Sequence, residues 1–149
     1  MTSRRLVIDA NILVRAVLGP RVRNLIVDFA EEITFFAPSV AFADASRHLP
    51  TLVGKRGIDT SVALSTLDTL RALVDDVPDD LMAQRKDEAL RRLQKRDADD
   101  WPILAAALAL DCPIWTEDKD FFGAGVPTWV TALVEIYLRD EDQPMATGK

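Results

Sequence analysis

Short apolar segments rich in β-branched residues alternate with helical segments along most of this chain of 149 residues. The predicted strands cover residues 5–9, 34–37, 77–78, 113–116 and 126–130. The predicted helices cover residues 11–18, 22–32, 60–74, 97–110 and 131–138, and two more begin at Ser39 and Asp79. Such alternation is typical of α/β proteins, in which helices cover both faces of a parallel sheet. We therefore expect one α/β domain with a short, mainly parallel sheet over residues 1–140, and a polar tail, 141–149, that frays.

Local signals mark where several of these helices begin and end. Gly19-Pro20 ends the first helix, because this pair breaks helices strongly. Ser39 is expected to cap the helix after strand 34–37, and Pro50 to kink or end it. Thr131 is expected to cap the last helix.

Several classes of protein are excluded at this stage. The longest uninterrupted apolar run, Ile103 to Leu110, is far shorter than the ~20 residues of a membrane span. No apolar signal-peptide region follows the first residues. Cys112 and His48 are the single cysteine and histidine, which excludes an internal disulfide and a structural zinc cage. We expect a cytoplasmic protein without a membrane segment, and an inert, buried Cys112.

Negative charge is concentrated in the second half of the chain. The net charge is −6, but residues 1–75 hold 9 Lys and Arg against 8 Asp and Glu, whereas residues 76–149 hold 9 against 16. Overall charge therefore cannot hold a polyanion. A nucleic acid would have to be bound through a local basic patch or a bound cation.

Acidic residues follow two of the predicted strands. Asp9 comes directly after strand residues 6–8, Asp118 follows residues 114–116, and Asp99-Asp100 open the helix between them. In parallel α/β sheets, ligands bind beyond the carboxyl ends of the strands. Each acid alone is equally well explained as a helix cap, but several converging carboxylates repel one another unless protons or a divalent cation neutralise them. Ligands that are all oxygen suit Mg²⁺ or Mn²⁺ rather than zinc.

Three segments of the chain carry these acids in a characteristic order. They are Val7-Ile-Asp-Ala-Asn-Ile-Leu-Val14, Asp97-Ala-Asp-Asp-Trp-Pro-Ile-Leu-Ala-Ala-Ala107 and Pro113-Ile-Trp-Thr-Glu-Asp-Lys-Asp-Phe121. Together they resemble the PIN-domain nucleases, a family that includes the VapC-type toxin ribonucleases. The resemblance extends from about Leu6 to Val130 and implies a single PIN-like domain.

The resemblance also implies the roles of individual residues. The catalytic set is Asp9, Asp44, Asp100 and Asp118, of which Asp9, Asp100 and Asp118 hold the metal, with Asn11, Thr116 and Asp120 in support. The family's third acid opens a helix, which selects Asp100 over Asp97 and Asp99. Asp118 and Asp120 compete for the fourth position. Asp44 stands where the family usually has a glutamate, so direct contact with the metal and contact through water both remain open.

The function implied by the resemblance is that of a Mg²⁺- or Mn²⁺-dependent ribonuclease, a hydrolase that cuts single-stranded RNA. The same resemblance makes the chain a candidate toxin, with an antitoxin protein and a second copy of itself as candidate partners. Because of the departure at Asp44, a PIN-fold binding or scaffold protein with a degraded metal site is the alternative. A receiver domain of the response-regulator kind is disfavoured, because its acid pair would directly follow the first strand and a lysine would end the last.

Other residues have two interpretations each. The basic cluster comprises Arg85, Lys86, Arg91, Arg92, Lys95 and Arg96. It is either an RNA-backbone clamp or a solvated helix face paired with Asp87 and Glu88. His48 is one turn from Asp44 and is either a general base or, the favoured interpretation, a structural surface residue. Trp115 and Trp129 are predicted to lie in the core.

Overall fold

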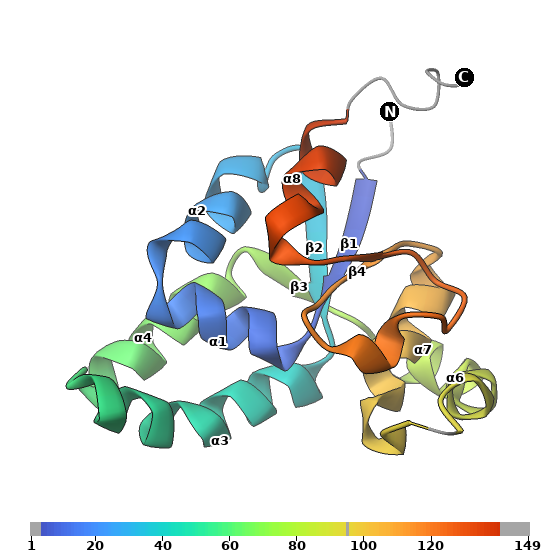
Figure 1. The fold of residues 1–149 in the computed structure, drawn as a ribbon, viewed down its shortest axis with the longest axis horizontal. Helices are drawn as coiled ribbons and strands as arrows, with labels where there is room; N and C mark the ends of the chain where they lie inside the picture. The colour runs from blue at the N-terminus through green and yellow to red at the C-terminus, as the bar shows by residue number, and fades with distance from the viewer. Residues whose placement is uncertain (1–3, 95, 141–149) are drawn as a thin grey trace.

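Five parallel strands form one sheet in the order β3-β2-β1-β4-β5 (Figure 1). The computed structural model describes residues 4–94 and 96–140. The strands are β1 (Arg4–Ile8), β2 (Ile33–Ala37), β3 (Val74–Asp76), β4 (Ile114–Trp115) and β5 (Thr128–Trp129). β1 is central: the chain adds β2 and β3 on one side of it and β4 and β5 on the other. The carboxyl ends of β1 and β4 therefore flank the point where the strand order reverses, which is where such sheets bind ligands.

Helices lie on both sides of this sheet, as the α/β prediction requires (Figure 1). They are α1 (Ala10–Leu18), α2 (Pro20–Phe29), α3 (Ser39–Arg56), α4 (Thr60–Arg71), α5 (Asp79–Gln84), α6 (Lys86–Arg92), α7 (Trp101–Leu110) and α8 (Thr131–Arg139). Two single 3₁₀ turns, η1 (Ala98–Asp100) and η2 (Lys119–Phe121), complete the described elements. Helices α1–α4 pack on one another, and α5 and α6 pack on α7, which contacts β1 and β4. None of the helices in the described ranges is long and apolar enough to cross a membrane.

The core is built around β1, β4 and α7. Residues 103–107 of α7 are all buried, because the helix is apolar around its whole circumference and its alanines let the sheet approach closely. Trp115 is fully buried, as predicted, and its indole Nε1 donates to Thr131 Oγ1 over 3.0 Å. Trp129 is only half-buried, so the core prediction for it was too strong. Cys112 is buried, as expected, and burial raises the pKa of its thiol to about 12.

The third strand lies earlier in the chain than the sequence pattern indicated. It is Val74–Asp76 rather than 77–78, and α4 ends at Arg71 instead of reaching Val74. Val74 pairs in parallel with Phe35 of β2. The end of the predicted helix 60–74 therefore joins the edge of the sheet as a strand instead of continuing the helix. Pro78 cannot donate a ladder hydrogen bond and precedes α5 instead.

Pro50 does not end α3, which continues to Arg56. A proline in a helix removes one backbone hydrogen bond, here to the carbonyl of Ser46. Ser46 and Pro50 are both exposed, so that carbonyl is open to water. Leu49 and Val53 on the opposite face are fully buried and hold the helix against the core.

The two predicted hydroxyl caps are also placed differently. Ser39 is the first residue of α3, and Pro38 is its cap residue. Thr131 is likewise the first residue of α8, after Val130. The Thr131 side chain instead accepts the hydrogen bond from Trp115, and its backbone N–H donates to Glu117 Oε2 over 2.6 Å.

Candidate metal centre

Asp9 is both a helix cap and a buried acid. It follows β1, and its Oδ1 accepts from the backbone N–H of Ile12 over 3.0 Å, which caps α1. Its Oδ2 accepts from the hydroxyl of Thr116. The residue is 6% exposed, and this burial raises the pKa of the Asp9 carboxyl to about 6 despite the two hydrogen bonds, which lower it. The cap interpretation and the site interpretation therefore both apply to this residue.

Thr116 joins the ends of β1 and β4. Its hydroxyl donates to Asp9 and accepts from the backbone N–H of Asp118 over 2.9 Å. Asp118 Oδ1 in turn accepts from the N–H of Asp120 over 2.9 Å and caps η2. One hydroxyl thus orients the buried acid after β1 and the loop that carries the acids after β4.

Asp100 comes to the same place from η1, immediately before α7. Burial, the largest cause, and then the negative charges of Asp118, Asp97 and Asp120 raise the pKa of the Asp100 carboxyl to about 7. Its Oδ2 is buried and accepts no hydrogen bond from any group that the structure describes. A buried carboxylate oxygen without a donor, surrounded by other carboxylates, requires a proton or a cation.

Two overlapping acidic groups share Asp100. The first lines a pocket of about 170 Å³ with Asp9, Asn11, Asp44, Asp99, Asp100 and Asp118. In the second, one oxygen each of Asp97, Asp100 and Asp120 lies within 4.8 Å of the others. Asp97, set aside on the sequence pattern, belongs to this second group. Its signal in the sequence is the acidic run that it forms with Asp99 and Asp100; in the structure Asp97 caps η1, where its carboxylate accepts from Asp99 N over 3.0 Å. The acidic cluster is consistent with a metal site.

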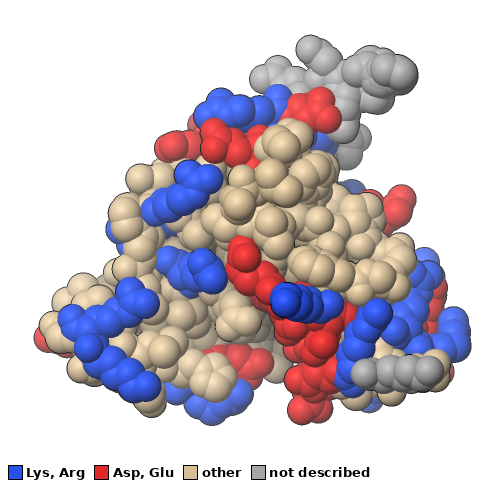
Figure 2. Space-filling model, viewed as in Figure 1, with Lys and Arg blue, Asp and Glu red and all other residues tan. Residues whose placement is uncertain are grey.

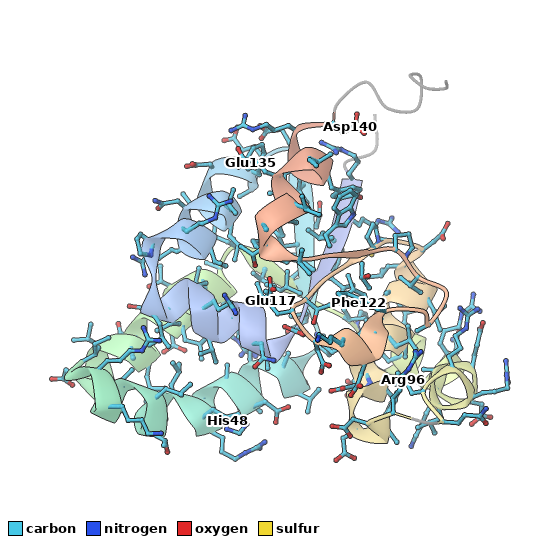
Figure 3. All side chains as sticks on the ribbon, in the orientation of Figure 1. His48, Arg96, Glu117, Phe122, Glu135 and Asp140 are labelled. Carbon is cyan, nitrogen blue, oxygen red and sulfur yellow. The ribbon has the colours of Figure 1, made fainter. Side chains whose placement is uncertain are left out.

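Asp44 and His48 form the α3 wall of the pocket. Asp44 is half-exposed and pairs with Arg47 over 2.8 Å on the same helix. His48 is exposed on α3 (Figure 3), as the structural interpretation predicts. It is also among the residues that line the pocket. The ion pair with Arg47 is a competing partner for the carboxylate of Asp44.

Most of the basic cluster is engaged with protein groups. Glu88 pairs with Arg85 over 3.1 Å and with Arg92 over 2.6 Å. Arg92 also donates to Ala124 O over 2.8 Å, and Arg96 donates to Asp120 O over 3.2 Å. These two arginines attach the loop around η2 to the end of α6 (Figure 3).

The remaining members of the cluster differ in their surroundings. The ammonium group of Lys86 lies 4.8 Å from the centre of the Trp101 ring. Arg91 is exposed. Lys95 lies outside the described residues. Of the two acids predicted to pair with this cluster, Glu88 does so, whereas Asp87 forms no ion pair among the described residues; contact of the cluster with RNA stays a prediction.

A family model described as a PIN domain matches residues 7–139. The chain belongs to the PIN domain family. The match includes the ends of β1 and β4, the start of α7, and therefore every acid described above. No curated protein matches the chain at the sequence level.

Solved structures share the PIN fold over most of the chain. A chain of VapBC2 from Rickettsia felis, in a complex with a DNA fragment from its promoter, matches with a TM-score of 0.64. It is 15% identical, and the match covers 85% of this chain and 98% of that one. FitAB bound to the IR36 DNA fragment gives a TM-score of 0.60, and FitAcB from Neisseria gonorrhoeae gives 0.58. Both are 15% identical over 85% of this chain, with 94% and 98% of their own chains covered. At this identity the likeness establishes the fold alone.

Proposed function

We propose that this PIN domain is a Mg²⁺- or Mn²⁺-dependent endoribonuclease that hydrolyses phosphodiester bonds of single-stranded RNA. The observation that carries the proposal is the unpartnered, buried Oδ2 of Asp100 beside Asp118 and in one pocket with Asp9. Membership of a family whose members are typically nucleases supports the same activity.

The acidic side chains would bind the cation and release protons as it binds. Asp9, Asp100 and Asp118 are the proposed ligands, and Asp97, Asp120 and Asp44 are proposed to hold its water molecules. When bound, such a cation polarises a phosphodiester and makes a water molecule more acidic. Thr116 and the Ile12 N–H keep both oxygens of Asp9 oriented, and Asp118 is held by its bond to Asp120. Because burial raises the pKa of Asp9 and Asp100, cation binding must displace protons from them near neutral pH.

The biological role we propose is that of the toxin in a toxin–antitoxin pair. The solved structures with this fold are VapBC and FitAB complexes, which supports this assignment by analogy. An open reading frame for a small DNA-binding protein next to this gene would favour it, and neutralisation of the nuclease by that protein would test it.

A second function is favoured by one observation. The carboxylate of Asp44 is already paired with Arg47, so a metal site that needs a fourth acid from α3 could be incomplete. In that case the domain would bind RNA or protein without cutting. Cleavage and binding must therefore be measured separately.

The test is cleavage of labelled single-stranded RNA by the purified protein with Mg²⁺, with Mn²⁺ and with a chelator. Asp9→Asn and Asp100→Asn should each lower the rate by orders of magnitude, because each removes a charged ligand. Asp68→Asn is the matched control, since Asp68 is an exposed acid on α4 outside the pocket. A DNA strand of the same sequence establishes the preference for RNA.

The possible results separate the two functions. Metal-dependent cleavage that both site variants lose and Asp68→Asn keeps supports the nuclease. Parental rates in either site variant would refute the assignment of the site. Binding of RNA without cleavage in either metal would refute the nuclease and support the scaffold alternative.

A further inference from the structure

A groove of about 570 Å³ adjoins the acidic pocket on the side of α1. Asn11, at the start of α1, lines both the groove and the pocket, so the two adjoin at this residue. The floor of the groove is apolar, with Val14, Leu18 and Leu52 among its lining residues. Three arginines, Arg15, Arg21 and Arg56, stand around it.

These three arginines converge from separate helices. Arg15 lies in the last turn of α1, Arg21 in the first turn of α2, and Arg56 is the final residue of α3. All three side chains are exposed. Figure 2 shows basic side chains on the left of the molecule, where α1 and α3 lie, and a second group at the lower right around α6, with a band of acidic side chains between them.

The arginines of the groove differ from the others in lacking partners. Within the described part of the chain, no hydrogen bond, ion pair or ring contact involves the side chain of Arg15, Arg21 or Arg56. Apart from Arg91, every other arginine has one. These are Arg4, Arg5, Arg23, Arg47, Arg71, Arg85, Arg92, Arg96 and Arg139. Guanidinium groups that bind no protein group remain free to bind phosphates.

Positive side chains outnumber negative ones in the groove. Glu117 is the one acidic residue among the described residues that line it. Its carboxylate accepts from the N–H of Thr131 over 2.6 Å at the N-terminus of α8, which stabilises its negative charge (Figure 3). The groove therefore presents an excess of positive charge next to an acidic pocket.

A second hollow, of about 690 Å³, also adjoins the pocket but is built differently. It shares Asp44 and Asp99 with the pocket and adds Asp79. Its two cations are engaged, Arg47 with Asp44 and Lys86 over a Trp ring. A phosphate chain leaving the metal centre would meet repulsion on this side and attraction on the other.

We propose that the groove of Arg15, Arg21 and Arg56 binds the phosphate backbone of the single-stranded RNA on one side of the bond that is cut. This inference rests on the proposed nuclease function and names where its substrate is held. Because the groove adjoins the pocket at Asn11, one strand can reach both, and the apolar floor can contact bases. The three arginines of the groove also supply the local basic patch that a chain of net charge −6 needs in order to bind a polyanion.

The test is binding of a labelled single-stranded RNA of random sequence, about twelve nucleotides long, in chelator, measured by fluorescence anisotropy over a salt series. Arg15→Ala, Arg21→Ala and Arg56→Ala should each weaken binding, about tenfold at low salt, because each loses a charge-assisted contact. The triple variant should lower the slope of log K against log salt by about 2, at ~0.7 for each phosphate on a single strand. Arg91→Ala is the matched comparison, since it removes an exposed, unpartnered arginine on α6.

Cleavage of the same RNA in Mn²⁺ is also measured for each variant. A labelled polyglutamate peptide is the second binding probe, because an acidic protein segment is the other ligand that three free arginines could bind. A parent that cuts RNA, with weakened binding and slope in the groove variants alone, supports the proposal. A triple variant that keeps parental RNA affinity and slope overturns it and leaves the nuclease intact. An equal loss with Arg91→Ala overturns it in favour of the α6 face. Loss of polyglutamate binding without loss of RNA binding overturns it in favour of an acidic protein segment. A parent that neither binds nor cuts RNA refutes the proposed function itself.

Discussion

Replacing Asp9 by asparagine should raise the melting temperature of the metal-free protein near neutral pH. Asp9 is 6% exposed, and burial raises the pKa of its carboxyl from 3.8 to about 6. Above pH ~6 the folded protein must therefore keep a buried negative charge that the unfolded chain exposes to water. Asparagine has nearly the same shape and carries no charge, so it removes this penalty.

The magnitude follows from the pKa difference between the folded and unfolded states. Below pH ~4 both states hold the proton, and Asp9 contributes no pH dependence. Between pH ~4 and ~6 the unfolded chain loses its proton first, so the free energy of unfolding falls as pH rises. At about 1.4 kcal/mol for each pKa unit, the loss is complete near neutral pH at roughly 3 kcal/mol. The pKa of Asp100 is raised as well, so its contribution has the same sign.

Part of this gain is lost again in the variant. The amide of asparagine can accept from only one of the two donors that Asp9 serves, the Ile12 N–H and the Thr116 hydroxyl. One lost hydrogen bond costs about 1 kcal/mol, which leaves a net stabilisation of about 2 kcal/mol. For a chain of this length that is a rise of roughly 4–8 °C in melting temperature.

The assay is a thermal melt of the parent and Asp9→Asn in chelator at pH ~4.5 and ~7.5, and in a metal titration at the higher pH. The difference between them should be small at low pH and largest at neutral pH. A cation that binds only the folded parent stabilises it by about 2.7 kcal/mol at a hundredfold excess over Kd, and the variant should gain less. Asp68→Asn should follow the parent throughout. Equal metal-induced shifts in the parent and Asp9→Asn, or a variant less stable than the parent at neutral pH, would refute a shared cation site with buried charge.

Three further outcomes follow from the geometry of the site. Thr116→Val should lower the free energy of unfolding by about 1–3 kcal/mol in urea denaturation, because Asp9 and the Asp118 N–H lose their buried partner. An unchanged denaturation midpoint would mean that the hydrogen bonds of this hydroxyl do not stabilise the fold. Asp44→Glu should keep or raise cleavage and Asp44→Ala should weaken Mg²⁺ binding, and a Mg²⁺ dependence identical to the parent's in Asp44→Ala would make the residue structural. At subsaturating metal, cleavage should rise with pH through about 6 to 7, as Asp9 and Asp100 give up their protons to the cation. A rate that stays flat from mildly acid to neutral pH would contradict this.

Local patterns in the sequence were sufficient to predict the α/β architecture. The segment around residues 6–8 and most of the helix predicted over 97–110 are recognisable as uninterrupted apolar runs, which are typical of elements buried on all sides; the structure begins that helix at Trp101, after η1. Asp9 and Asp118 follow neighbouring parallel strands, whose ends meet at one edge of a sheet, whereas Asp100 was named from the resemblance to PIN-domain nucleases. All three line one pocket, and their role as metal ligands stays a prediction.

Contacts between distant segments decided what the sequence left open. Val74 became a strand because the edge of β2 was free to pair with it, and Pro50 stayed helical because Leu49 and Val53 anchor α3 in the core. The Thr116 hydroxyl meets Asp9 across 107 positions of sequence, a bond that no local pattern encodes. The local sequence also does not show which arginines have partners. Composition counts their charges, but only the packing of the helices decides which guanidinium groups are used within the protein and which remain free around the groove.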